Sequence, residues 1–366
     1  MVICDRAAFP RDKICGDALI ADSLGAIAAL GLTDRIVPRA AESSALGVVT
    51  PGGVATSIPG VLRVLPRREL DAILLEHAIA RGAEFRQLTV DGPIEDGDRV
   101  AGVRARDASG REVEIRAPLT VLATGENGAT LRAFDPHART EASGTALRVY
   151  ARPRAGTPQH ACVIALDRSL TPGYAWAFPA PGGVMNVGVG FFKGSGLRES
   201  GVNLRGGLEA LLAGQGPIGG RFGPFADATP IAGAPVRTSL QGTAAARPGL
   251  AIIGEAAGTT YAATGEGIGK AMESGLLVAE LAASSADLPS AGIAFRDALH
   301  AKFGARFRAY AVAQRWVSFP WFIDYVGRRA NQSPYITRRL SEFLSETDLP
   351  TRVFSLRGLW RLATAR

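Results

Sequence analysis

The residues best suited to chemistry lie in positions 250–275, which read LAIIGEAAGTTYAATGEGIGKAMESG. A short apolar run ends there at Gly254 and Glu255. A second cluster of glycines then opens a helical pattern, at Gly265, Gly267 and Gly269. Backbone N–H groups and the positive end of a helix dipole bind anions, and a carboxylate accepts hydrogen bonds from sugar-like hydroxyls. The segment therefore predicts a site for a large phosphorylated cofactor.

The N-terminus carries a second feature of a nucleotide site. The sequence MVICD places three apolar residues before Asp5, and an acid at a strand tip binds ribose in dinucleotide-binding sheets. A glycine fingerprint normally precedes such a strand, and no GxGxxG stands before Asp5 in this sequence. We therefore hypothesise that the natural protein is longer at this end. An intact N-terminus at Met1 in the native protein would contradict the hypothesis.

Composition restricts the class of protein. A chain of 366 residues exceeds what one core normally serves, so two lobes or a lobe with a helical appendage is expected. The three cysteines form no CxxC pair, which favours a reducing, cytoplasmic setting. The four histidines have no metal-ligand spacing, so no metal site is expected. No apolar stretch of about 18 residues predicts a transmembrane helix.

Basic residues are concentrated in the tail. The net charge is +7, and residues 291–366 hold 13 Lys and Arg against 5 Asp and Glu. Aromatic residues also lie among these arginines, including Trp316, Phe319, Trp321, Phe322, Tyr325, Phe354 and Trp360. This pattern is typical either of a packed helical layer with solvated arginines or of peripheral contact with an anionic membrane. Nucleic-acid binding is not expected, because no binding module surrounds the charge.

Periodicity predicts how these segments are organised. Helical spacing covers 18–32 and 67–82, and alternation with turn pairs over 84–115 predicts a three-stranded meander. Around the PGG turn at 181–183, YAWAFPA and VMNVGVGFF predict an antiparallel hairpin. The order indicates a cofactor domain interrupted by a substrate domain. The predicted boundaries are 1–45, 66–139 and 241–290 for the cofactor domain, 46–65 and 140–240 for the substrate domain, and 291–366 for a C-terminal helical region.

Five segments together resemble the geranylgeranyl reductase family of flavoproteins, within the group built like para-hydroxybenzoate hydroxylase. They are DRAAFPRDKICGD (5–17), the R-x-x-L-D of 67–71, GENGATLR (125–132), YAWAFP with NVGVG (174–190) and GEAAG with TGEGI (254–268). Tyr174 and Phe178 favour the reductase branch over halogenase relatives. The resemblance implies an α/β fold: a Rossmann-like FAD-binding domain, lacking its N-terminal unit here, with an inserted antiparallel-sheet substrate domain and C-terminal helices.

The resemblance also implies roles for particular residues. Asp5 would bind the adenosine ribose, Arg67 would lie near the pyrophosphate, and Glu255 would bind the ribitol. The implied FAD-binding residues are Asp5, Arg6, Gly16, Arg67, Gly128, Gly254, Glu255, Gly258, Gly265, Gly267 and Ile268. The implied substrate wall is Tyr174, Trp176 and Phe178. Cys15 would lie beside the isoalloxazine, where its thiol would position substrate, relay a proton or simply fill space.

Three functions are compatible with this pattern. The resemblance favours an FAD-dependent oxidoreductase that reduces C=C bonds of prenyl groups, geranylgeranyl or a quinone side chain, with electrons from NAD(P)H or another reductant. Its substrate would be a hydrophobic prenyl-type molecule, which suits a tail resting on a membrane. The first alternative is a flavin-dependent monooxygenase or halogenase acting on an aromatic natural product. The second is a non-catalytic homologue that binds a prenyl lipid.

Overall fold

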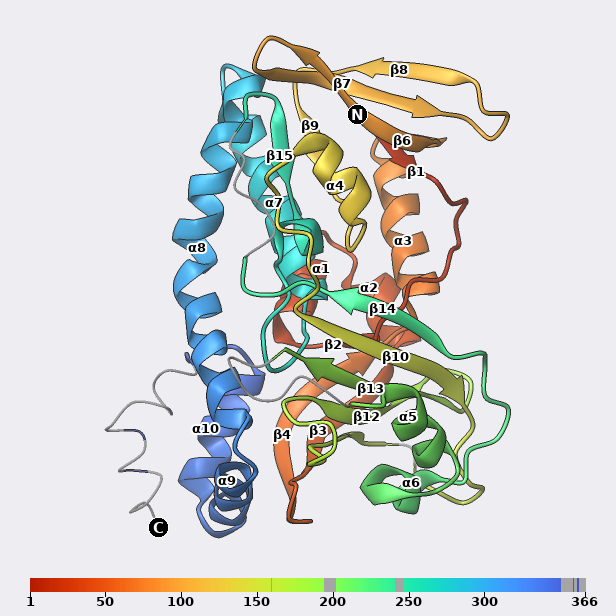
Figure 1. Ribbon diagram of the computed structural model, residues 1–366, viewed down its shortest axis with the longest axis vertical. Coiled ribbons are helices and arrows are strands. Elements are labelled where there is room, and N and C mark those ends of the chain that lie inside the picture. The colour runs from red at the N-terminus through yellow and green to blue at the C-terminus, as the bar shows by residue number, and fades with distance from the viewer. Residues whose placement is uncertain (159, 194–201, 241–246, 350–357, 359–360, 362–366) are drawn as a thin grey trace.

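The computed structural model describes residues 1–366 apart from 159, 194–201, 241–246, 350–357, 359–360 and 362–366. Two tail aromatics named above, Phe354 and Trp360, lie outside the described residues. Figure 1 shows two halves stacked along the long axis of the molecule. Helix α8 (Leu288–Val317) runs along both halves and connects them.

The lower half in Figure 1 is built on an eight-stranded sheet. Its strands, in spatial order, are β14 (Ala232–Val236), β10 (Gly144–Ala151), β13 (Val184–Phe192), β12 (Tyr174–Ala180), β11 (Cys162–Ala165), β3 (Ala41–Val49), β4 (Ala55–Val64) and β2 (Ala18–Leu19). Neighbouring strands are antiparallel except β3 and β11. Segments from three distant parts of the chain thus share one surface.

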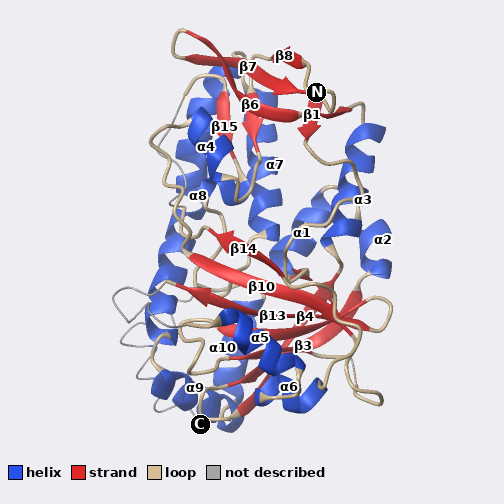
Figure 2. Cartoon of the chain, turned by 45° about the vertical axis from the view of Figure 1, so that its right-hand side comes forward, coloured by secondary structure: helices blue, strands red, loops and turns tan. Residues whose placement is uncertain are grey.

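Alternation along β12 gives the sheet two different faces, because successive strand side chains point to opposite sides. Ala175 and Ala177 pack in the core beneath α5 (Leu204–Leu212) and α6 (Gly216–Phe222). Trp176 and Phe178 belong to the opposite cluster, with Leu344. On that side α9 (Pro320–Gln332) and α10 (Pro334–Leu344) contact β4, at the lower end of the molecule in Figure 2.

The predicted hairpin around the PGG turn is present as β12 and β13, with Trp176 opposite Gly188 and Phe178 opposite Asn186. Gly182 and Gly183 have φ of 82° and 73°. These are left-handed conformations that glycine adopts without a Cβ penalty, which explains the turn sequence.

The upper half contains three small sheets. Parallel pairs form between β1 (Val2–Asp5) and β5 (Glu84–Gln87), and between β9 (Thr120–Leu122) and β15 (Leu250–Ile252). The third sheet is the antiparallel meander of β6 (Thr89–Asp96), β7 (Arg99–Arg106) and β8 (Glu112–Arg116). The predicted meander was therefore placed too early at its start, because 84–87 pairs with the N-terminal strand instead.

Helices surround these sheets and complete the mixed α/β fold that the sequence predicted. They are α1 (Ala21–Ala29), α2 (Thr33–Ile36), η1 (Val37–Arg39), α3 (Arg67–Ala80), α4 (Gly128–Phe134), η2 (Gly254–Ala257) and α7 (Ile268–Ser284). Helix α7 packs on α1 and α8. Within the part of the chain that the structure describes, no helix is both long and apolar enough to cross a bilayer.

Candidate functional site

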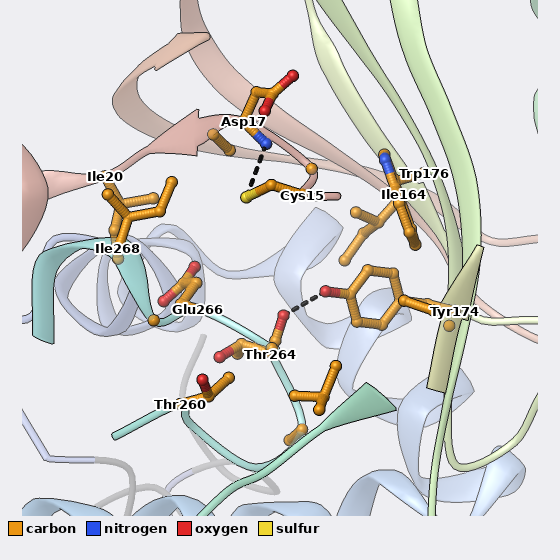
Figure 3. A pocket seen from close by; sticks show the side chains of 18 of the residues that line it. Cys15, Asp17, Ile20, Ile164, Tyr174, Trp176, Thr260, Thr264, Glu266 and Ile268 are labelled. Atoms are coloured by element: carbon orange, nitrogen blue, oxygen red, sulfur yellow. Dashed lines mark hydrogen bonds between the residues drawn. The ribbon is translucent and has the colours of Figure 1, made fainter. Parts of the chain in front are cut away.

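A cavity of about 630 Å³ lies between the two halves. Eleven predicted site residues line it: Cys15, Gly16, Arg67, Tyr174, Trp176, Phe178, Gly254, Glu255, Gly265, Gly267 and Ile268. Four others do not, namely Asp5, Arg6, Gly128 and Gly258. The fold thus brings the loop before β2, strand β12 and the loop before α7 to one space (Figure 3). The start of α3 also lines this cavity, through Arg67.

The end of the cavity near η2 is rich in charge. Glu255 begins the turn that follows β15, and its Oε1 accepts a hydrogen bond of 3.2 Å from the backbone N–H of Arg237. Burial raises the pKa of Glu255, while nearby Lys13 acts in the opposite direction. The Lys13 ammonium also pairs with Glu126 at 3.5 Å, and the Arg237 guanidinium donates to the carbonyl of Gly125. Cations and carboxylates alternate here.

A chain of ion pairs leads from the tip of β1 to the cavity. The Asp5 carboxylate accepts from the backbone of Ala7 at 2.9 Å and from Arg11 at 3.0 Å. Arg11 also donates to Asp71 at 3.0 Å. The Asp71 carboxylate in turn accepts hydrogen bonds from Nε and Nη2 of Arg67, at 2.6 and 2.8 Å. The R-x-x-L-D motif is therefore an i, i+4 bidentate pair that fixes Arg67 at the start of α3.

The glycine loop before α7 is tightly fitted. Gly265 has φ of 72°, and a Cβ there would lie 3.0 Å from the Phe192 ring and 3.4 Å from the Tyr174 hydroxyl. A Cβ on Gly269, in the first turn of α7, would collide with the Asp22 carboxylate. Close packing explains these glycines, and it leaves the N-terminus of α7 at the cavity wall.

An aromatic wall formed by Tyr174, Trp176 and Phe178 closes one side of the cavity. Trp176 donates its ring N–H to Asn186 at 2.9 Å, and the Asn186 amide donates to the carbonyl of Cys15 at 2.8 Å. A Cβ on Gly188 would collide with the Trp176 ring. The NVGVG sequence thus supplies the amide that orients the tryptophan and the glycine that makes room for it.

The Cys15–Asp17 turn lies against this wall. The Asp17 N–H donates to the Cys15 Sγ at 3.3 Å. Burial, with the neighbouring Asp17 carboxylate, raises the pKa of Cys15 and outweighs the guanidinium of Arg67. The sulfur therefore remains a thiol at neutral pH rather than a reactive thiolate.

Asp17 is a buried acid of the cavity wall that the sequence pattern did not single out. It is fully buried and accepts hydrogen bonds from the Tyr150 hydroxyl, from Asn186 at 2.8 Å and from the Arg67 backbone at 3.3 Å. Desolvation raises its pKa to about 6, although these donors act to lower it. The sequence held one indication of its importance, because Asp17 directly follows Cys15 and Gly16.

A second missed carboxylate is Glu266, within the TGEGI sequence. It lines the cavity beside Gly265 and Gly267, and Figure 3 shows it in the same space as Cys15, Tyr174 and Thr264. Burial raises its pKa well above the ordinary range of a glutamate, and the charges of Asp22 and Glu346 add to the effect. Because glycines flank Glu266 on both sides, the sequence indicated a backbone site for the cofactor and gave no sign of a role for this side chain.

The predicted residues outside the cavity have structural positions of their own. Gly258 ends η2 with φ of 74°, and Gly128 begins α4 behind the Asn127 side chain, which accepts from the N–H of Thr130. Arg6 is exposed, and its carbonyl accepts from Gln87. Their assignment to FAD stays a prediction.

Several buried polar atoms near these loops have no hydrogen-bond partner among the described residues. They include Oγ1 of Thr120, Thr124, Thr259 and Thr264, and Nε and Nη1 of Arg237. Buried polar groups normally find partners, so this concentration is unusual. Together with the Glu255 carboxylate and the glycine loop, these residues fit a cofactor that bears phosphates and hydroxyls.

Comparison with known proteins identifies the class of this cofactor. Residues 1–155 match the family model of an FAD binding domain. This match covers the N-terminal 155 of the 366 residues, and it supports FAD as the cofactor and an FAD-dependent oxidoreductase as the class of protein.

Among curated proteins, the menaquinone reductase of Mycolicibacterium smegmatis is 28% identical over 91% of this chain and 82% of its own length. The digeranylgeranylglycerophospholipid reductase of Methanosarcina mazei is 30% identical over 60% of this chain. That match spans only 52% of the archaeal protein, about half of its length. The predicted resemblance to prenyl-type reductases is thus confirmed as distant homology.

Solved structures confirm the fold. A geranylgeranyl bacteriochlorophyll reductase-like protein from Thermoplasma acidophilum has a TM-score of 0.69 at 19% identity, covering 95% of this chain and 85% of that protein. A flavin-dependent brominase has a TM-score of 0.71 at 18% identity, covering 99% of this chain and 91% of the brominase. Reductases and halogenases share this architecture, so the fold alone does not choose a reaction.

Proposed function

We propose that the protein reduces carbon–carbon double bonds of prenyl chains, such as geranylgeranyl groups or the side chain of a quinone. The shape of the cavity carries this proposal. From the glycine loop it passes the aromatic wall and reaches an apolar end between the sheet and the C-terminal helices, lined by Val317, Phe322, Val326, Leu340 and Leu344. A prenyl chain has no hydrogen-bonding groups and suits such a lining. The names of the menaquinone and digeranylgeranylglycerophospholipid reductases support this substrate class.

The residues of the cavity would hold the alkene and exclude water. FAD, when bound in its reduced form, supplies a hydride, and NAD(P)H or another reductant would restore it. The Tyr174 hydroxyl donates to the carbonyl of Thr264, which fixes the ring as part of the wall. An isolated alkene accepts hydride poorly, so a proton must reach its second carbon early or together with the hydride.

The exposed aromatic residues at the start of α9 favour contact with a membrane. Phe319 and Trp321 are 42% and 63% exposed, and the Trp321 ring lies 5.7 Å from the ring of Phe322, which lines the cavity. Arg315 is exposed on α8, and Arg328 is exposed on α9 itself. Aromatic and basic side chains together bind anionic interfaces. A lipophilic substrate would thus enter the apolar end of the cavity from the bilayer.

The test is the product. Purified protein carrying FAD would be reduced anaerobically and given menaquinone or a digeranylgeranyl lipid, and the product would be analysed by mass spectrometry. A gain of two hydrogens per saturated bond supports the proposal. Addition of oxygen or halogen in the presence of O₂ contradicts it, as does tight binding of the lipid without conversion.

A further inference from the structure

Glu266 occupies an unusual place in the cavity wall. It lies between Gly265 and Gly267, two residues before α7 begins, and its backbone carbonyl is held by the N–H of Tyr261 at 2.8 Å. Its side chain is half-buried and faces the space also bounded by Cys15 and Tyr174 (Figure 3). None of the described residues donates a hydrogen bond to the Glu266 carboxyl group or forms an ion pair with it. A fixed loop therefore presents to the cavity a carboxyl that has no partner among the described residues.

The one buried ammonium close to this loop, that of Lys270, is already neutralised. Its Nζ lies 3.3 Å from Asp22, 2.6 Å from Glu273 and 2.8 Å from Glu346. Arg306 adds a second cation, 3.7 Å from Glu346. Three carboxylates thus face two cations, and the cluster keeps an excess negative charge.

A negative cluster behind a desolvated carboxyl favours its neutral, protonated form. Burial is the largest cause of the raised pKa of Glu266, followed by Asp22 and Glu346, and Lys270 only partly opposes them. The titratable and charged groups that face this region come from every neighbouring element: Cys15, Asp22, Tyr174, Tyr261, Lys270, Arg306, Tyr310 and Glu346. These surroundings therefore favour the protonated form of the Glu266 carboxyl group.

We propose that Glu266 is the general acid that protonates the alkene during reduction. The inference rests on the proposed function. The alkene π bond breaks, one carbon receives the hydride and its electron pair from reduced FAD, and the other receives the proton of the Glu266 carboxyl. Two C–H bonds form, FAD becomes oxidised, and Glu266 is left as a carboxylate that solvent reprotonates. The same arrangement, a carboxylic acid kept neutral by an apolar site, performs acid catalysis in other enzymes.

The other acidic groups of the cavity are less suited to this step. Asp17 is fully buried behind the Cys15 turn, and three donors occupy its carboxylate. The Tyr174 proton is engaged with Thr264. The Cys15 thiol has a raised pKa and lines the cavity, so it is the competing acid that the experiment must separate from Glu266.

The test compares Glu266→Gln with Glu266→Asp, Cys15→Ser and the exposed α7 control Glu280→Gln. For Glu266→Gln we expect prenyl saturation to fall about 100-fold or more, as loss of a general acid does. Its FAD content, flavin reduction by the donor and prenyl-lipid binding should stay at wild-type levels. Glu266→Asp should retain part of the activity, and Glu280→Gln all of it. The wild-type rate should fall at high pH, where Glu266 loses its proton, and the remaining rate of Glu266→Gln should not show this fall.

An infrared readout tests the proton itself without turnover. The wild-type protein at pH 7 should show a protonated-carboxyl stretch that is lost in Glu266→Gln and kept in Cys15→Ser. Absence of that band, or wild-type saturation rates in Glu266→Gln, would overturn the acid role. Loss of saturation in Cys15→Ser equal to that in Glu266→Gln, with the high-pH limb gone, would assign the proton to the thiol instead. Wild-type protein that holds FAD but adds no hydrogen to any prenyl lipid overturns the proposed function, whatever the infrared band shows.

Discussion

Two acids border the same cavity, the fully buried Asp17 and the half-buried Glu266, and their surroundings differ sharply. Asp17 receives three hydrogen bonds, from Tyr150, Asn186 and the Arg67 backbone. Glu266 receives none from the described residues and faces a cluster with excess negative charge. Burial raises the pKa of both, but the donors hold Asp17 at about 6, whereas the pKa of Glu266 rises well above the ordinary range. The hydrogen-bond donors around Asp17 make its carboxylate a link between neighbouring segments. Glu266 receives no such hydrogen bonds from the described residues, and its surroundings favour the protonated acid.

The two acids also depend on different parts of the fold. Asp17 joins β10 and β13 to the Cys15 turn, so its partners belong to the eight-stranded sheet. Glu266 depends on charges from α1, α7, α8 and the segment after α10, which meet at Lys270 and Arg306. Variants of each cluster should therefore have separable effects.

The largest expected effect is that of Lys270→Met. Lys270 is 4% exposed, and its loss leaves the buried Asp22 carboxylate without a cation and Glu346 with Arg306 alone. Removing one partner from a buried ionic network costs about 3–5 kcal/mol of unfolding free energy. Urea unfolding would measure it, with the exposed Lys302→Met as control, for which we expect a change within about 0.5 kcal/mol. Equal unfolding midpoints for the two variants would show that the cluster is not a stabilising unit.

Asp17→Ala comes next. It leaves the Tyr150 hydroxyl, the Asn186 amide and the Arg67 N–H without their acceptor, and it places a Cβ-bearing residue other than Asp or Asn at φ of 63°. With about 1 kcal/mol for each of these effects, we expect a loss of about 4 kcal/mol in unfolding free energy at pH 7. The exposed pair of Asp91 with Arg106 provides the control Asp91→Ala, which should change the unfolding free energy far less, because solvent screens an exposed ion pair. A loss in Asp17→Ala no larger than in the control would contradict the linking role of its carboxylate.

Part of the fold could be predicted from the sequence, because it depends on patterns among residues that are close together in the chain. Alternation from Tyr174 to Phe178 predicted an aromatic face, and the PGG turn predicted the hairpin that carries it; both are present. The glycines at 265–269 predicted a close approach of backbone, and the structure shows what each would meet.

What the sequence could not indicate depends on contacts between distant segments. Asn186 reaches Cys15 across 171 positions, and no periodicity links the two. Lys270 is an ordinary helical lysine by sequence, and only its contacts with α1 and with the segment after α10 make it a buried charge in an ionic cluster. Whether Glu266 keeps its proton follows from those same contacts, so a linear motif could not give it.

The pH dependence of stability gives a smaller, signed prediction for Asp17. Its pKa is about 6 in the folded protein against an ordinary 3.8, so the folded state holds the proton more tightly than the unfolded state. This contribution is fully present below about pH 4 and is lost as the pH rises toward 6, by at most about 3 kcal/mol. We expect the unfolding free energy of wild type minus that of Asp17→Asn to fall over this window. A difference that is flat, or that rises with pH, would mean that Asp17 stays ionised when folded.

Replacing the exposed aromatic residues at the start of α9 should have the smallest effect on the unfolding free energy and the largest effect on membrane binding. Because Phe319 and Trp321 are exposed, the double variant Phe319→Ala with Trp321→Ala should change the unfolding free energy by no more than about 0.5 kcal/mol. Binding to vesicles of anionic phospholipid, followed by sedimentation, should nevertheless fall at least several-fold. Ile79→Ala, an exposed apolar residue on α3 at the other end of the molecule, should bind as wild type does. Equal vesicle binding by all three proteins would separate the apolar end of the cavity from any membrane, and the prenyl substrate would then have to reach it from solution or a carrier.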